Sequence, residues 1–235
     1  MRPDGQSAVG LSPRLELHQA PTPDPTWSEH WHFDFWDADA EVGGFVRIGR
    51  DPGLDRVWYW ACLVRAAIPP ELALVIDPSV SFAPRNRLEL RSEGVWADHI
   101  CETPFEHWTI GLEAYAVALD DPTEAYGRMY GDRVPVGYDL EWEALPDHQP
   151  DRGVVPATDG YEQACVVHGE ILVGNEAIDL SGFGHRHHRW GPADWLQGSH
   201  FSVSARLDDT STLAMSGHRG VVSGRFRSPE GTVEI

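Results

Sequence analysis

One stretch of the chain, from Gly182 to Trp195, is denser in reactive side chains than any other. It contains three histidines, two arginines, two tryptophans and one aspartate, so it offers an acid, a base, a cation and aromatic faces within a few residues. In a strand, side chains alternate between two faces, which places Arg186, His188 and Trp190 on one side. We expect that face to point inward.

The other polar side chains of this stretch, His185, His187 and Arg189, fall on the opposite face. The strand should end at Gly191-Pro192, because proline has no N–H to donate to a neighbouring strand. The three residues after this proline should then turn back toward the same site.

These residues suit acid–base conversion of a large apolar molecule. Asp194 is the candidate acid, because burial beside Trp190 and Trp195 would raise its pKa and keep it protonated. His188 is the candidate base or orienting group, since an imidazole, with an ordinary pKa near ~6.5, can serve either way. The ring of Trp190 could stabilise a developing carbocation by roughly 0.5–2 kcal/mol.

Each of these residues also fits a structural role. Arg186 would then sit in a buried ion pair with a carboxylate such as that of Glu162. Asp194 could cap a turn, and His188 could be a hydrogen-bonded core histidine. The two tryptophans could simply pack the wall of a cavity. The residue types alone leave both interpretations open.

Histidines at alternating positions raise a third possibility, which is a metal site. The His-x-His spacing can place two ligands on one face of a strand. No HExxH motif or facial carboxylate pattern accompanies these histidines, so metal binding stays an alternative and we expect no cofactor. The histidines concerned are His185, His187, His188, His30 and His32.

A second polar and aromatic cluster follows residue 101. Its carboxylates could contact a ligand or simply face solvent, because Glu102, Glu106 and Trp108 share one face of a strand. The chain has 10 tryptophans, and cavities for flat apolar ligands are typically lined by aromatic residues. The further candidate ligand-binding residues are therefore Trp58, Trp60, Trp96, Trp108 and Glu102.

The charge of the chain limits its possible partners. The formal net charge is −19, and all 18 basic residues are arginine. The absence of lysine excludes Schiff-base chemistry and a P-loop lysine. So acidic a protein repels phosphate backbones, and we expect a hydrophobic small molecule rather than nucleic acid as its partner.

The three cysteines, Cys62, Cys101 and Cys165, are far apart and free of CxxC spacing. This pattern fits buried, unreactive thiols in a reducing compartment better than disulfides or a zinc ribbon. The N-terminus has no apolar signal segment, and no run reaches the ~18 apolar residues of a membrane span. We therefore expect a cytoplasmic protein without a membrane span, which could form a homodimer.

Short alternating segments between proline, glycine, aspartate and asparagine clusters predict an all-β fold, as an antiparallel barrel or sandwich. The segment from Trp27 to Asp37 alternates aromatic and polar residues, as a half-buried strand does. Helical signals are confined to residues 121–130, where a proline follows a cap-like aspartate. We expect at most one or two short helices.

The composition also predicts a domain organisation. Residues 1–25, with five prolines, should form a flexible or extended N-terminal arm. A first β unit should span 26–145, and a second unit, which could be incomplete, should span 159–235. The polar segment 146–158, with three prolines, should be the linker between them.

Three segments carry a family resemblance: Trp27–Asp37 with the following Gly43–Gly49, then Trp96–Trp108, and finally Gly182–Trp195. Together they resemble the lipocalin-like superfamily of carotenoid 1,2-hydratase (hydroxyneurosporene synthase) and the AttH-like proteins, which has many uncharacterised actinobacterial members. In the third and most specific segment, members carry Arg-Asp-His-Ser-Trp-Gly, a spacer and Arg-Asp-Trp. The matching residues here are Arg186, His188, Trp190, Gly191, Asp194 and Trp195. The departures are His187, Arg189 and Ala193.

The resemblance implies two tandem lipocalin-like β units around an apolar cavity. For the hydratase branch it also implies acid-catalysed addition of water to an isoprenoid double bond. The acidic residue that this branch uses on a later strand has no counterpart here, where Met215, Ser216 and Gly217 occupy the region.

Two functions follow from this resemblance and from the residues. The first is binding of an isoprenoid, polyene or polyketide-like molecule, with cofactor-free hydration, cyclisation or isomerisation; such an enzyme would be a lyase or an isomerase. The second is a non-catalytic carrier of the same fold, and fold alone does not separate the two.

Overall fold

The computed structural model describes residues 11–66, 71–82, 88–145, 150–152, 158–192, 200–208, 210–218 and 220–235. These residues form antiparallel strands and short 3-10 helices, and none of their helices is long and apolar enough to cross a membrane. The helices are η1 (Pro13–Glu16), η2 (Pro52–Leu54) and η3 (Pro122–Tyr126). The strands are β1 (Trp27–Asp37), β2 (Val42–Asp51), β3 (Arg56–Arg65), β4 (Glu71–Asp77), β5 (Ser81–Phe82), β6 (Leu88–Ser92), β7 (Val95–Thr103), β8 (His107–Leu119), β9 (Asp132–Ala144), β10 (Asp151–Arg152), β11 (Asp159–Val173), β12 (Glu176–Pro192), β13 (His200–Arg206), β14 (Thr212–His218), β15 (Val221–Ser228) and β16 (Gly231–Glu234).

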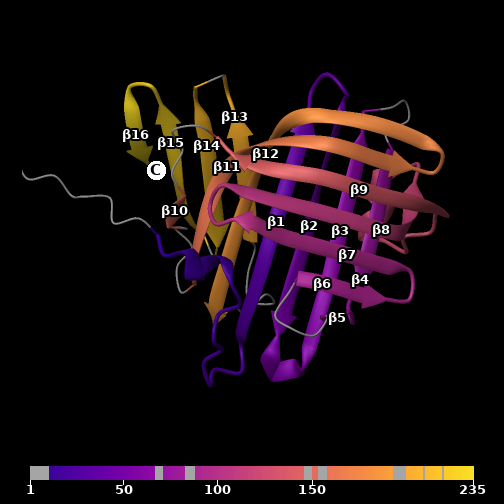
Figure 1. Cartoon of the computed structure of the whole chain (residues 1–235), viewed down its shortest axis with the longest axis horizontal. Coiled ribbons are helices and arrows are strands. Elements are labelled where there is room, and N and C mark those ends of the chain that lie inside the picture. The colour runs from indigo at the N-terminus through magenta and orange to yellow at the C-terminus, as the bar shows by residue number, and fades with distance from the viewer. Residues whose placement is uncertain are drawn as a thin grey trace, which may run out of the picture.

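Eight of these strands close into a ring, which we call the barrel (Figure 1). Hydrogen-bonded neighbours follow one another in the order β1, β2, β3, β4, β8, β9, β11, β12 and back to β1. Every pair is antiparallel, and β7, β6 and β5 extend the sheet from the first part of β8. The predicted all-β, antiparallel lipocalin-like fold is confirmed.

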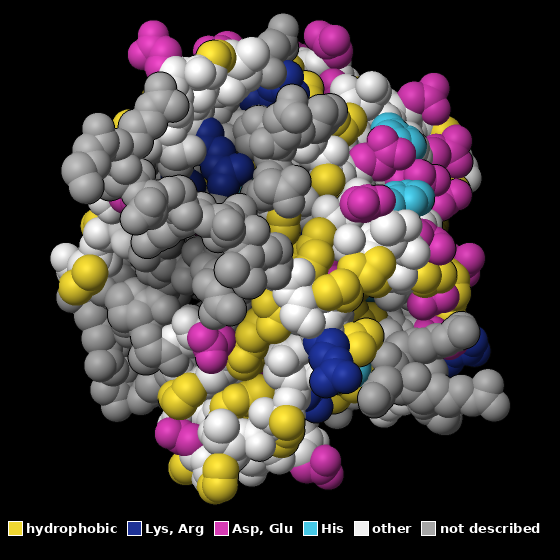
Figure 2. Space-filling view, turned by 60° about the vertical axis from the view of Figure 1, so that its left-hand side comes forward, with side chains coloured by type: hydrophobic (Ala, Val, Ile, Leu, Met, Phe, Trp, Pro, Cys, Tyr) yellow, Lys and Arg dark blue, Asp and Glu magenta, His cyan; other side chains and the backbone are white. Residues whose placement is uncertain are grey.

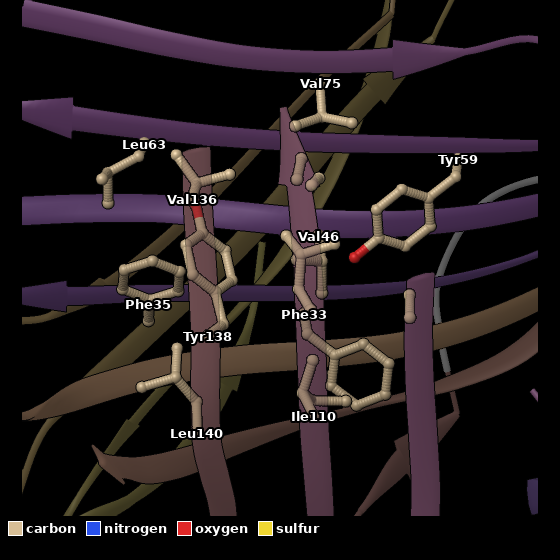
Figure 3. Packing of buried hydrophobic residues seen from close by; sticks show 14 of the residues in the cluster. Phe33, Phe35, Val46, Tyr59, Leu63, Val75, Ile110, Val136, Tyr138 and Leu140 are labelled. Atoms are coloured by element: carbon tan, nitrogen blue, oxygen red, sulfur yellow. The ribbon is translucent and has the colours of Figure 1, made fainter. Parts of the chain in front are cut away.

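Large aromatic side chains fill the interior of the barrel between crossing strands (Figure 3). The alternating aromatic residues of β1, Trp31, Phe33 and Phe35, are each at most 2 % exposed. The ring of Phe33 lies 5.2 Å from that of Trp108 on β8 and 5.6 Å from that of Trp142 on β9. Each such buried side chain stabilises the fold by about 1.5–3 kcal/mol, so the period-two pattern of β1 fixes which face of the strand turns inward.

The last four strands, β13 to β16, form a separate sheet beside the barrel, which we call the second sheet (Figure 1). This arrangement corrects the expected boundary at 146–158. Strands β11 and β12 follow that segment and yet complete the barrel, because β12 pairs with β1 from Trp27–Pro192 to Trp36–Phe183. Among the described residues, the second sheet therefore begins at His200.

The described part of the N-terminal arm packs against one end of the barrel. Ser12 caps η1, and Glu16 at the end of this helix is 3 % exposed. Glu16 accepts hydrogen bonds from the backbone N–H of Phe105, at 2.7 Å, and from the hydroxyl of Tyr161 on β11. His18 contacts Trp31 edge-on, with ring centroids 5.0 Å apart. The composition of the arm gave no sign of these contacts.

Candidate functional site

The two faces of β12 carry different groups, as the alternation predicts, and both faces are buried. Arg186 and His188 share a face with Phe33 and Trp31, their partners on β1, and point into the barrel. The other face, with His187, points outward and is covered by the second sheet.

The inward Arg186 is held entirely by protein partners. Its Nη2 lies 2.9 Å from Glu16 Oε1 and 2.6 Å from Gln163 Oε1, and its Nη1 donates to the hydroxyl of Tyr161 at 2.8 Å. Burial disfavours the charged guanidinium, but Tyr161 and Glu16 outweigh burial and raise the pKa of Arg186. A buried cation with this many partners has a structural role.

The carboxylate expected to pair with Arg186 was Glu162, and this expectation is wrong. Glu162 stands opposite His187 in the β11–β12 register, so it lies on the outward face and binds Arg189 there. Glu16, from the N-terminal arm, takes its place on the inward face.

The inward His188 is also held by protein partners. Its Nδ1 is 2.7 Å from the carbonyl oxygen of Leu15, and its Nε2 is 2.9 Å from Glu29 Oε1. Each ring nitrogen of His188 therefore faces an oxygen atom of the protein. Burial would raise the pKa of Glu29, but His18, His188 and the charge of Arg50 outweigh it and lower that pKa to about 2.

The four tryptophans expected to line a pocket are not brought together. Trp108 is in the barrel core, whereas Trp58 and Trp60 point outward because Tyr59 between them points inward. Trp60 is 40 % exposed. Trp96 also lies outside, since the adjacent Ala97 is in the core.

The remaining candidates are spread over different surroundings. Glu102 is exposed, which fits the solvent-facing alternative. Trp190 is half-buried, with its ring 4.8 Å from that of His188. Asp194 and Trp195 lie outside the described residues, so their roles stay predictions.

The outward face of β12 lines a cleft of about 300 Å³ between the barrel and the second sheet, which we call the intersheet cleft. Strands β1, β2, β11 and β12 form its floor, and β13 and β14 cover it. The lining side chains that matter below are His32, Asp34, Glu162, His187, Arg189 and Ser204.

His32 and Asp34, on the same face of β1, form the polar centre of this cleft. The Nε2 atom of His32 is 3.6 Å from Asp34 Oδ2. Asp34 accepts hydrogen bonds from the backbone N–H of His185, at 2.7 Å, and from the hydroxyl of Ser204, at 3.0 Å. The carboxylate is thus held from both sheets. The Nδ1 atom of His32 is buried and has no hydrogen-bond partner among the described residues.

Burial sets the protonation states in the cleft. It lowers the pKa of His32, although Asp34 opposes this effect. It lowers the pKa of His187 well below the ordinary value, and the charge of Arg189 lowers it further. Burial would raise the pKa of Asp34, but His32 and His185 outweigh it and lower that pKa. At neutral pH the rings of His32 and His187 are therefore neutral, and the carboxyl group of Asp34 is ionised.

Arg189 brings a positive charge to the same cleft. Its Nη2 lies 3.0 Å from Glu162 Oε2, and its side chain is 6 % exposed. Burial lowers the pKa of Arg189, while Glu162 opposes this effect, and an arginine stays protonated at neutral pH. Its Nε is buried without a hydrogen-bond partner in the part of the chain described.

The histidines considered as metal ligands divide between the inside and the outside of the barrel. His188 is inside the barrel, while His30, His32 and His187 cluster outside it, with the rings of His32 and His187 stacked 4.8 Å apart. Within the described ranges, their ligand atoms do not form a group of three that could hold an ion. Side chains that could hold an ion do come together on the outer surface of β8 and β9, and His107 is one of them.

The sequence motif points to the inward face of β12, whereas the pair of His32 and Asp34 lies on the outside of the barrel and was not predicted. A signal was present, because residues two apart on a strand share a face. The departures from the family motif, His187 and Arg189, were a second signal, since both line the cleft.

The cysteines fit the expectation of unreactive thiols. All three are free, with Cys62 and Cys165 buried and Cys101 partly buried. Burial raises the pKa of Cys62 to about 11 and the pKa values of Cys101 and Cys165 to about 12. Little thiolate forms at neutral pH under these conditions.

The fold is similar to solved structures at low sequence identity. A candidate AttH protein from Nitrosomonas europaea has 15% identity and a TM-score of 0.65, over 100% of this chain and 75% of that chain. CghA, crystallised with Sch210972, has 13% identity and a TM-score of 0.56, over 89% of this chain and 60% of that chain. These similarities show a shared lipocalin-like fold.

No curated protein matches the chain by sequence. A family model does, and its description is a domain of unknown function, DUF7064. The match runs over residues 12–227, which includes the barrel and most of the second sheet. The chain therefore belongs to the DUF7064 family.

Proposed function

We propose that the protein binds a largely apolar small molecule with a carbonyl or carboxylate group in the intersheet cleft and converts it by acid–base chemistry. The observation that carries this proposal is the pair of His32 and Asp34, in which a neutral, carboxylate-supported imidazole lines the cleft. Perturbed titratable groups that converge in one cleft are typical of active sites.

The lining of the cleft supports a ligand with two kinds of surface. Phe45, Val203 and Met215 offer apolar contacts to its body, and Arg189 offers a positive charge to its oxygen. A cleft of about 300 Å³ matches the lower end of small-molecule sites. Isoprenoid and polyketide-like molecules with one polar group have this combination of surfaces.

The proposed reaction is a proton transfer. The Nδ1 atom of His32 removes a proton from a carbon next to the carbonyl group, while Asp34 orients the ring and stabilises the imidazolium that forms. The electron pair moves onto the carbonyl oxygen, where Arg189 stabilises the negative charge. In a β,γ-unsaturated substrate, return of the proton to the far carbon of the C=C bond shifts that bond into conjugation and completes an isomerisation.

For Arg186 and His188, on the inward face of β12, the contacts support a structural role in place of ligand binding and catalysis. Arg186 and His188 are held by Glu16, Glu29 and the carbonyl of Leu15. We infer that these two motif residues position the N-terminal arm, and that catalysis depends on the outward face.

A non-catalytic carrier is the second candidate, and one observation favours it. A cavity of about 660 Å³ lies at one end of the barrel, between the ends of β3, β4, β8 and β9. Leu63, Ala73 and Val134 form part of its wall, and Arg65 and Glu71 add charges. An apolar molecule could be held there without contact with His32.

Binding of 8-anilinonaphthalene-1-sulfonate, a fluorescent apolar anion, distinguishes the two locations. The proposal expects that Ala214→Trp, which fills the intersheet cleft, abolishes the fluorescence increase, and that Ala73→Trp, which fills the barrel cavity, does not. The opposite pattern supports the carrier. Ala177→Trp, on the exposed end of β12, is the matched control and should bind the dye normally.

Catalysis needs a separate test, because dye binding reports only the site. Small ketones and unsaturated acids that displace the dye would be incubated with the protein in D₂O, and mass spectrometry would measure deuterium in the recovered molecule. We expect His32→Gln to keep binding and to lose exchange. Equal exchange by wild type and His32→Gln would rule out His32 as the base.

A further inference from the structure

A cluster of imidazole and carboxylate groups lies on the outer surface of the barrel, on the three strands that precede β12 in the ring. It consists of His107 on β8, Glu141 and Glu143 on β9, and His168 on β11. These strands are adjacent, with β9 in the middle. Figure 2 shows histidine side chains among acidic ones on the molecular surface.

The register of the three strands brings these four side chains together. Glu141 and Glu143 share a face of β9, because they are two residues apart. His168 stands opposite Glu141, and His107 stands opposite Glu143. A histidine on each flanking strand therefore stands beside one of the two carboxylates on the central strand. Paired strands hold such positions rigidly.

The ligand atoms of three of these side chains lie close enough together for one metal ion, and His168 is near both carboxylates. Nε2 of His107 is 3.0 Å from Glu141 Oε2, and the ligand atoms of His107, Glu141 and Glu143 all lie within 4.8 Å of one another. Nε2 of His168 is 3.6 Å from Glu143 Oε1 and 4.0 Å from Glu141 Oε2. Ligands of a tetrahedral Zn²⁺ ion, at roughly 2.0–2.2 Å from the metal, are separated by about 3.3 Å.

The surrounding charge also favours a cation. Asp139 continues the row of acidic residues on the same face of β9, and it stands directly opposite Glu170 on β11. Like charges in direct opposition destabilise a sheet, and a bound cation relieves this repulsion. The net charge of −19 raises the local concentration of cations further.

We propose that His107, His168, Glu141 and Glu143 form a Zn²⁺ site on the surface of the barrel. Two imidazoles and two carboxylates are a donor set that zinc accepts, whereas Ca²⁺ and Mg²⁺ prefer oxygen ligands alone. The four side chains are between about one third and just over one half exposed, so an ion reaches them from solvent without opening the fold. Bound zinc ties three strands together and stabilises the barrel.

Isothermal titration of the full chain with ZnCl₂ tests this site. We expect saturable binding of one ion per chain, and a rise in the midpoint of thermal unfolding on zinc addition. Co²⁺ used in place of zinc should give the visible absorption bands of a four-coordinate centre. The absence of saturable zinc binding would overturn the proposal.

Variants locate the binding and separate it from other histidines. His168→Ala should weaken zinc binding by roughly 100-fold or more, and the double variant His107→Ala/His168→Ala should abolish the thermal shift. Glu170→Gln, which changes charge on the same surface without removing a ligand, should keep the affinity within a few-fold. Because these side chains are exposed, the variants should fold, and circular dichroism would confirm it. Unchanged affinity and thermal shift in the double variant would contradict the assignment.

Discussion

Glu16 and Arg186 lie 170 residues apart in the chain and meet in a buried ion pair, with 2.9 Å between Oε1 and Nη2. The pair joins the N-terminal arm to the inward face of β12. Both side chains are at most 3 % exposed, so solvent does not screen their attraction.

Replacement of Glu16 tests the strength of this connection. Glu16→Gln leaves the charge of Arg186 buried without its counter-ion, and loss of one partner of a buried pair costs about 3–5 kcal/mol of unfolding free energy. Urea unfolding followed by circular dichroism would measure this loss. The double variant Glu16→Gln/Arg186→Met should be less destabilised than the sum of its single variants, because the uncompensated charge is gone. Additive losses would show that the two side chains do not act as a pair.

Glu29 should make stability depend on pH in the acid range. Its pKa is about 2 in the folded protein, against an ordinary value of 4.5, so ionised Glu29 stabilises the fold above pH 4.5. That contribution, about 3 kcal/mol from the size of the shift, is lost as the pH falls from 4.5 toward 2. Glu29→Gln should flatten this part of the stability profile, measured by urea unfolding at several pH values. The same acid loss in the variant would assign it to other carboxylates.

His99, in the barrel core, should make the protein less stable than an apolar residue at the same position would. It is 3 % exposed, and neither of its ring nitrogens has a hydrogen-bond partner among the described residues. Its ring contacts those of Phe33 and Tyr59, so a phenyl ring suits its surroundings. His99→Phe should raise the unfolding free energy at pH 7 by about 1–3 kcal/mol, because a buried polar group without a partner costs that much. Thermal unfolding would detect the gain, and Leu172→Phe, at an exposed position of β11, should show little change.

The pH dependence of the same residue gives an independent check. Burial lowers the pKa of His99 to about 3, so the folded protein resists its protonation while the unfolded chain accepts it below about pH 6.5. Titration of His99 therefore leaves the unfolding free energy unchanged above about pH 6.5 and lowers it as the pH falls toward 3. His99→Phe should therefore gain more over wild type at pH 5 than at pH 7. An equal gain at both values would mean that the effect is one of packing alone.

Gly184 allows β12 to approach β1 closely. A Cβ atom at this position would lie 2.1 Å from the carbonyl oxygen of Asp34 and 2.9 Å from Nε1 of Trp142, which donates a hydrogen bond to that oxygen at 3.0 Å. The added methyl group would force the backbone of β1 at Asp34 to move. Gly184→Ala should therefore cost about 1–3 kcal/mol of unfolding free energy. Gly137→Ala is the control, since its nearest neighbours would be at 3.6 Å. A loss no larger than that of Gly137→Ala would show that β12 can shift freely.

The sequence by itself determined the fold class and the two faces of β1 and β12. Side chains alternate strictly along a strand, so Trp31 and Phe33 had to share a face, and Arg186 had to lie opposite His187. The cap of Asp121 before a short helix was equally local, and it is present. Local geometry is enough for such features.

Tertiary structure alone decided what each face of β12 meets. Nothing near Arg186 in the sequence points to Glu16, because the pairing depends on how the barrel closes and where the N-terminal arm ends. The cover over His32 and His187 comes from β13 and β14, which alternation along β1 does not reveal. Burial by that second sheet, rather than residue type, lowers the pKa of His32 and creates the candidate site. Alternation tells which side chains share a face, but only contacts between distant segments determine whether that face meets solvent, core or ligand.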